Sequence, residues 1–124
     1  MTIDTAIKKT DELMPNSVEQ RDKVSWLSML DGMVYRDVWL RHAGLCERVF
    51  DRYTPDTPVD TELLIPEPYD EIYRWFLEMH ICDVNGEVQK YNNASAKYNT
   101  ALLAYMDYVN RTHMPVPRTE LKLW

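Results

Sequence analysis

The sequence has little of several features that commonly reveal a protein's function. It contains two cysteines in 124 residues, Cys46 and Cys82, which are too few and too far apart to predict a disulfide framework and fit a reducing cytoplasm. No apolar run approaches the roughly 18 to 20 residues that a membrane-spanning helix requires. Charged residues interrupt the N-terminal segment, so we expect neither a membrane span nor a signal peptide.

The short motifs that identify common enzyme classes are also missing. GxxxxGK[ST], GxGxxG, GxSxG and HExxH do not occur, so nothing predicts a nucleotide-binding loop, a serine hydrolase or a zinc protease. The basic residues form no stripe that could neutralise a row of phosphates. We therefore expect no tight nucleic-acid binding, no catalytic residue and no cofactor.

The formal net charge of -6 is concentrated in one segment. Between residues 51 and 71, which we call the acidic arm, seven acids accompany the single base Arg52, whereas thirteen acids balance thirteen bases elsewhere. The acids of the arm are Asp51, Asp56, Asp60, Glu62, Glu67, Asp70 and Glu71. We expect this arm to be largely solvent-facing and to contribute little to folding.

Hydrophobic periodicity predicts a mainly α protein with a single domain over residues 1–124. The predicted helices span residues 3–14, 17–43, 67–84 and 87–113, with an extended segment at 45–66 and a C-terminal tail at 115–124. A capping box of Ser17 and Gln20 is expected to open the second helix, and Gly44 to end it. The stretch from Leu45 to Tyr53 fits either a short strand or a helix.

The last two predicted helices are separated by Asn85 and Gly86. A glycine just past a helix end can adopt the left-handed conformation that lets the chain reverse, which predicts an antiparallel hairpin. The rival is one long kinked helix, because the heptad phase of the final helix extends back through residues 84 and 77. The predicted fold is a small helical bundle built on a long antiparallel helical hairpin, with an extended acidic arm and an extended C-terminal tail.

The final helix alternates large and small residues on one face, a pattern that predicts close packing against another helix. This seam consists of Tyr91, Ala94, Tyr98, Ala101 and Tyr105. Residues 101–109 are apolar on nearly all sides, and one hairpin cannot cover them all. Together with the tail, they predict a contact with another subunit or partner, made by Leu102, Leu103, Met106, Val109, Leu121, Leu123 and Trp124. The alternative is that the tail folds over residues 101–109 of its own chain.

Few residues are candidates for chemistry. Two pairs could be imagined as metal ligands, namely His42 with Cys46 and His80 with Cys82. Two ligands do not make a zinc site, and residues two apart on a helix point to different sides, so no metal site is predicted. Glu71 and Glu78 could form an acid-base pair, although a water-exposed helix face is the ordinary explanation for them.

Several segments resemble small helical proteins encoded in the head-to-tail gene cluster of tailed bacteriophages and prophages. They read TELLIPEPYDEIYRWFLE (residues 61–78), NGEVQKYNNASAKYNTALLAYMDY (85–108) and NRTHMP (110–115). SVEQRDKVSWLSMLDGMVYRDV (17–38) is similar to the second helix of these proteins. The shared marks are a proline-tyrosine opening to a helix, a glutamate shortly after a turn, and YNN followed by Tyr98-Asn99. The chain thus resembles head-tail connector, or adaptor, proteins; residues 39–60 and the tail after Pro117 match the pattern least.

The resemblance implies a virion structural protein that is made in the bacterial host cytoplasm and forms a homo-oligomeric ring, commonly twelvefold, in the phage neck. The ring would lie between the portal protein and the tail or other neck proteins, with no membrane involved. DNA would pass through it without sequence-specific binding, and the acidic arm would repel or ignore the phosphates. An acidic helical regulator or inhibitor that binds a partner protein would have the same composition and remains the alternative.

Overall fold

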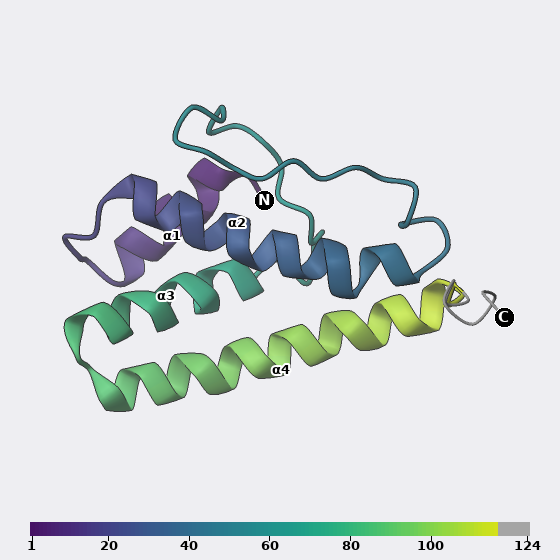
Figure 1. Ribbon diagram of the computed structural model, residues 1–124. Coiled ribbons are helices and arrows are strands. Elements are labelled where there is room, and N and C mark those ends of the chain that lie inside the picture. The colour runs from purple at the N-terminus through teal and green to yellow at the C-terminus, as the bar shows by residue number, and fades with distance from the viewer. Residues whose placement is uncertain (117–124) are drawn as a thin grey trace, which may run out of the picture.

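The computed structural model describes residues 1–116 of the protein. These residues form four α-helices and one short 3-10 helix: α1 (Ile3–Leu13), α2 (Gln20–Asp37), η1 (Trp39–Arg41), α3 (Ile72–Asn85) and α4 (Val88–Thr112). α3 lies between α4 on one side and α1 and α2 on the other (Figure 1). Within residues 1–116 there is no strand, and the prediction of a mainly α bundle is confirmed.

The first two helices begin and end for local reasons. The Thr2 hydroxyl accepts a hydrogen bond from the backbone N–H of Thr5 at 3.1 Å, which caps α1, and Pro15 follows its end. α2 begins at Gln20, later than predicted, because the side chain of Asn16 accepts from the N–H of Val18 and holds the preceding residues in a loop. The expected capping box at Ser17 is therefore not formed.

The end of α2 also differs from the prediction, which extended the helix to residue 43. α2 stops at Asp37, and the tighter turn η1 follows. The indole N–H of Trp39, which is buried, donates to the hydroxyl oxygen of Tyr105 at 2.8 Å. A contact between residues 66 positions apart thus replaces the last turns of the predicted helix.

α3 begins at Ile72, five residues after the predicted start. Residues 66–71 form successive turns instead, with the N–H of Tyr69 bonded to the carbonyl of Pro66 and that of Tyr73 bonded to Asp70. At the other end, Gly86 has a φ of 72° and its neighbour Glu87 donates its N–H back to the carbonyl of Cys82. The chain reverses at this point and α4 runs back along α3 (Figure 1), so residues 84–87 contain a turn and not a kink.

The segment from Val38 to Glu71 contains no α-helix, and it crosses the molecule outside α2 (Figure 1). Leu45 to Tyr53 is neither a strand nor an α-helix, because turns over residues 42–47 lead into an irregular extended path. Further along, the carbonyls of Val59 and Thr61 accept from the first N–H groups of α1. These carbonyls satisfy helix donors that have no partner within α1.

One hydrophobic core joins the helices to this irregular segment. α3 contributes Ile72, Tyr73 and Leu77, all completely buried. The irregular segment contributes further buried side chains, namely Leu45, Tyr53, Leu63 and Ile65. The extended segment 45–66 therefore packs as part of the core, and the expectation that the acidic arm contributes little to folding is wrong for Tyr53, Leu63 and Ile65.

After α4 ends, residues 114–116 run beside residues 41–43, at and just after the end of η1. The N–H of Ala43 donates to the carbonyl of Met114, and the N–H of Val116 donates to the carbonyl of Arg41, both at 2.8 Å. Gly44 has a φ of 84°, and a Cβ atom there would lie 3.3 Å from the His113 ring. The first residues of the predicted tail thus lie against their own chain, and residues 117–124 are outside the described part.

Candidate functional site

The predicted seam of α4 lies along the face that packs on α3. Ala94 and Tyr105 are buried, and Tyr98 contacts the ring of Phe76 with ring centroids 5.2 Å apart. Ala101 is partly buried against the core, and Tyr91 at the beginning of the helix is half-exposed. The heptad pattern therefore marks a contact between helices of one chain.

The residues predicted to contact another subunit have different surroundings. Val109 is completely buried in the core of its own chain, and Leu102 and Met106 are partly buried against that core. Leu103 remains exposed, with 63% of its surface accessible. Val109 needs no second subunit to cover it, because residues 1–116 of its own chain already bury it. Leu121, Leu123 and Trp124 lie outside the described residues.

The acidic arm combines paired and unpaired carboxylates. Four of its acids are exposed and have no ion-pair partner among residues 1–116, namely Asp51, Asp56, Asp60 and Glu67. The Met1 ammonium lies 3.2 Å from Glu62 and 3.6 Å from Asp70, which is buried. Glu71 pairs with Lys9 of α1 and with Arg74 of α3. The acids at one end of the arm are thus paired, and the other four face solvent.

The exposed part of the arm contains an ordered loop, residues 54–61, which we call the acidic loop. The N–H of Thr57 donates to the carbonyl of Thr54 at 3.0 Å, with Pro55 and Asp56 between them. A second turn begins at Pro58, whose carbonyl accepts from the N–H of Thr61 at 3.1 Å. Proline and aspartate favour such turns, so the loop presents its carboxylates in a defined conformation.

The candidates for metal binding and acid-base chemistry are occupied by other contacts. The two ring nitrogens of His42 lie 2.6 Å from the Val38 carbonyl and 2.8 Å from the Asn110 side chain. The ring of His80 stacks on Trp26, and burial lowers the His80 pKa. Within residues 1–116, no three His, Cys, Asp or Glu side chains are grouped so that they could hold a metal ion. Glu78 is buried beside Arg74, so it is not a water-exposed residue as expected.

A buried carboxylate that the sequence reasoning missed lies at the centre of the molecule. Asp31 of α2 is completely buried and accepts hydrogen bonds from the hydroxyls of Tyr53 at 2.5 Å and Tyr73 at 2.6 Å. It also accepts from the backbone N–H of Leu64 at 3.0 Å, and the Tyr73 hydroxyl accepts from the N–H of Ile65 at 2.7 Å. One carboxylate therefore joins α2, α3 and two points of the irregular segment.

The Asp31 carboxylate has a structural role. Burial raises the Asp31 pKa, and the three hydrogen bonds from Tyr53, Tyr73 and Leu64 oppose that rise. Burial and the neighbouring Asp31 charge raise the pKa values of both tyrosines, which keeps them protonated as donors. No buried side-chain nitrogen or oxygen within residues 1–116 lacks a partner, so the cluster has no free group that points to a substrate.

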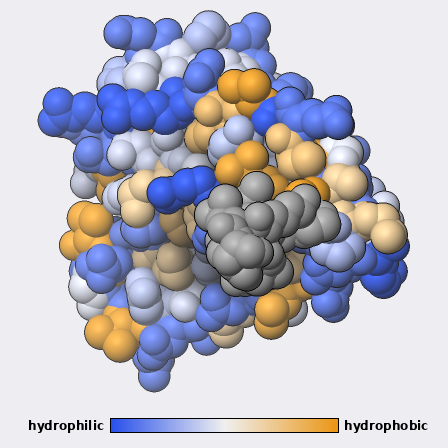
Figure 2. All heavy atoms as spheres, turned by 45° about the vertical axis from the view of Figure 1, so that its right-hand side comes forward, coloured by the Kyte–Doolittle hydropathy of each residue, from blue (hydrophilic) through white to orange (hydrophobic). Residues whose placement is uncertain are grey.

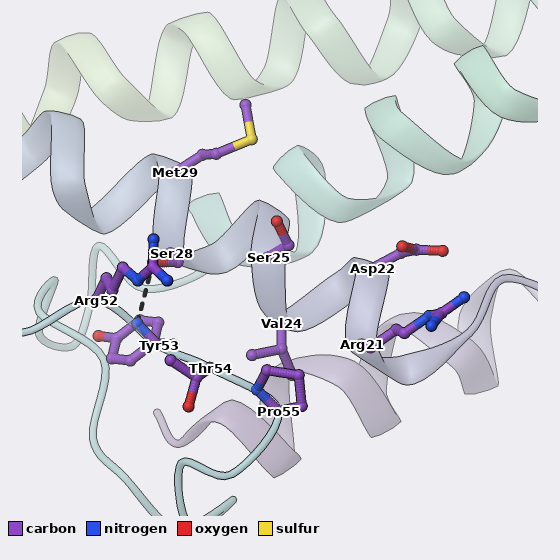
Figure 3. Close-up of a pocket in the computed structure, with 10 residues that line it drawn as sticks. All are labelled: Arg21, Asp22, Val24, Ser25, Ser28, Met29, Arg52, Tyr53, Thr54 and Pro55. Atoms are coloured by element: carbon purple, nitrogen blue, oxygen red, sulfur yellow. Dashed lines mark hydrogen bonds between the residues drawn. The ribbon is translucent and has the colours of Figure 1, made fainter.

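An open groove of about 460 Å³ separates the first half of α2 from residues 52–55 (Figure 3). Its wall includes Arg21, Arg52 and the Ser28 hydroxyl, which accepts from the Tyr53 N–H at 3.0 Å. Arg21 is paired with Glu19 at 2.7 Å. The described residues that line the groove include Ser25 and Ser28 but no histidine or cysteine, and their one carboxylate is that of Asp22.

Another cavity lies at the opposite end of α2, and we call it the aromatic pocket. Its volume is about 250 Å³, and it is lined by Trp39, Leu45, Arg48, Leu64, Pro66, Tyr105, Tyr108, Val109 and His113. The Arg48 guanidinium lies 5.3 Å from the Trp39 ring centroid, and the ring centroids of Tyr69 and Tyr108 lie 4.9 Å apart with the rings tilted by 32°. Figure 2 shows hydrophobic residues beside hydrophilic ones at this end of the molecule. Such a pocket can bind an apolar group that has a negative charge next to it.

Comparisons with protein-family models, with curated proteins and with solved structures find no match to this chain. None of the helices within residues 1–116 is long and apolar enough to span a bilayer.

Proposed function

We propose that this chain is a head-tail connector, or adaptor, protein of a tailed bacteriophage or prophage. In this proposal it forms a ring in the virion neck between the portal protein and the tail, and DNA passes through the ring. The proposal rests on the resemblance of residues 17–38, 61–78, 85–108 and 110–115 to such proteins. The surfaces described above support it, because they suit contacts between proteins better than chemistry.

The observation that carries the proposal is an uncharged stripe on the solvent side of α4. Six exposed residues form it over more than three turns: Asn92, Ala96, Asn99, Thr100, Leu103 and Ala104. A helix face in permanent contact with water usually carries charges, whereas the centres of protein interfaces are depleted of them. The stripe therefore fits a lateral contact between neighbouring subunits.

The charge distribution supports passage of DNA without binding. The chain has no basic stripe, so a ring built from it has no row of charges that would hold phosphates. A ring of identical subunits also needs two different contact faces on each subunit. The stripe of α4 and the surfaces of the irregular segment are different faces in this sense.

The test is the assembly state of the purified chain, with and without portal protein, measured by sedimentation velocity and negative-stain microscopy. We expect closed rings, formed alone or on the portal. A chain that stays monomeric or dimeric in both conditions would contradict the proposal and favour the alternative, an acidic regulator of a partner protein.

A variant pair makes the test specific to the stripe. Ala96→Arg combined with Ala104→Arg places two charges on the proposed contact, and it should abolish rings while leaving the helical content unchanged. Both alanines are exposed, so each change should alter the folding free energy by no more than about 0.5 kcal/mol. Ser17→Arg is the control, because Ser17 is exposed in the loop before α2. Rings that persist in the double variant would exclude the stripe as the contact.

A further inference from the structure

We infer that the acidic loop of one copy docks on the aromatic pocket of a second copy. The inference rests on the proposed function in taking another copy of the chain as the partner, and it adds a specific pair of surfaces. Each surface is present once on every chain, so their pairing is a head-to-tail contact of the kind that builds rings.

The aromatic pocket has the composition of a protein-binding site. Its base consists of buried Trp39, Tyr105 and Val109, and its exposed edge carries Arg48. The indole N–H of Trp39 and the Tyr105 hydroxyl are bonded to each other, so neither needs a further partner. The surface open to a partner is that of Arg48, Pro66 and half-buried Tyr108. Tryptophan, tyrosine and arginine are the residues that contribute most to binding at protein interfaces.

The acidic loop is complementary to that pocket. Pro58 and Val59 form its apolar tip, and the exposed carboxylates of Asp56 and Asp60 lie on either side in the sequence. Aromatic grooves bind prolines well, and a carboxylate beside Arg48 adds an attraction between opposite charges. The two turns of the loop are already formed in the single chain, which lowers the entropy cost of binding.

A chain cannot fill its own pocket with its own loop. Pro55 lies beside Val24 near the beginning of α2, whereas the pocket includes Trp39 beyond its end. Trp39 lies fifteen positions after Val24, and the thirteen of them within α2 alone correspond to roughly 20 Å at about 1.5 Å per residue. The loop is also tied to α1 by the bond from the Asp4 N–H to the Val59 carbonyl. The complementary surfaces therefore have to come from different copies.

The experiment reverses the charges on each side and then on both. Arg48→Glu gives a chain with an acidic loop and an acidic pocket, and Asp56→Lys with Asp60→Lys gives a chain in which both are basic. Each variant should associate at least roughly tenfold more weakly than the wild type, as measured by sedimentation velocity. The chain with all three changes should regain association, and so should an equal mixture of the two variants.

Two controls separate binding from folding and from net charge. Arg48→Gln removes the charge without introducing a like charge, and circular dichroism shows whether each variant keeps its helices. Asp51→Lys reverses an exposed acid of the arm outside the acidic loop, and it should leave association unchanged within about twofold. Association of the wild type should also weaken in about 0.5 M salt, because the charged groups are then screened.

The outcomes distinguish this inference from the proposed function. Rings that form equally well with the reversed charges, or a triple variant that stays as weak as its parents, would overturn the inference while leaving the connector proposal in place. If deletion of residues 117–124 abolishes association and the charge reversals do not affect it, the tail is the contact and the inference is overturned. A wild-type chain that never associates contradicts both. Charge-sensitive association without closed rings supports the inference and counts against the connector.

Discussion

Replacement of Asp31 by alanine is the most informative test of the fold. The change removes the acceptor for three donors, namely the hydroxyls of Tyr53 and Tyr73 and the N–H of Leu64. Hydrogen bonds to a charged group are worth about 1.5 to 3 kcal/mol each, and removal of a buried charge recovers part of that loss. We therefore expect Asp31→Ala to lower the free energy of unfolding by about 3 to 5 kcal/mol.

Variants of Tyr53 and Tyr73 show how much each hydrogen bond to Asp31 contributes to stability. Tyr53→Phe removes one donor to Asp31 and should cost about 1.5 to 3 kcal/mol. Tyr73→Phe should cost more, because it also leaves the buried N–H of Ile65 without its acceptor. Urea denaturation followed by circular dichroism measures these differences, with Asp107→Ala as an exposed control. An Asp31→Ala chain as stable as the control would refute the role of the carboxylate.

The pH dependence of the same variant tests the state of the carboxyl group. Burial raises the Asp31 pKa in the folded chain, so the folded chain binds this proton more tightly than the unfolded chain does. The stabilisation from Asp31 is therefore greatest below its unfolded pKa and falls as the pH rises through the raised value. The stability difference between wild type and Asp31→Ala should be larger at about pH 4 than at about pH 7. Equal differences at the two pH values would contradict this.

Three further predictions concern the surfaces. Ala101→Leu should overpack the contact between α3 and α4 and lower the free energy of unfolding by about 1 to 3 kcal/mol. The control Ala104→Leu changes an exposed residue and should alter stability little. Equal melting temperatures for the two variants would contradict the packing role of the seam. Neutralising Asp56, Asp60 and Glu62 together should leave stability within about 1 kcal/mol in thermal melts, and loss of folding would mean that these carboxylates support the core. Deleting residues 117–124 should leave a helical monomer that no longer assembles onto its partner, because the apolar side chains of Leu121, Leu123 and Trp124 are worth about 1.5 to 3 kcal/mol each when buried. A truncated chain that melts much earlier but assembles normally would show that the tail belongs to its own core.

Local signals predicted the helices well where their ends are set locally. The end of α1 just before Pro15 and the turn at Gly86 were predicted because proline and glycine act through their own backbones. The end of α2 was not, because it depends on the bond between Trp39 and Tyr105, which are distant in sequence. Residues 38–71 show no hydrophobic periodicity from which their long-range contacts could be predicted.

The burial of Asp31 could have been predicted from the sequence. Asp31 occupies the apolar face of α2, four residues after Leu27 and three before Val34, and a charge in that position indicates a buried partner. The aromatic pocket had none, because its residues come from three separate parts of the chain. The sequence predicted packing roles for Tyr105 and Val109 but gave no sign that they lie beside Trp39 and Arg48.

The position of Asp31 also affects how the chain folds during synthesis. The ribosome completes α1 and α2 while Tyr73, which lies 42 residues beyond Asp31, has yet to be made. At the usual rates of about 5 to 20 residues per second, this carboxylate and the apolar face around it wait roughly 2 to 8 s for their last partner. We therefore expect the N-terminal half of the nascent chain to keep this apolar face uncovered until α3 emerges.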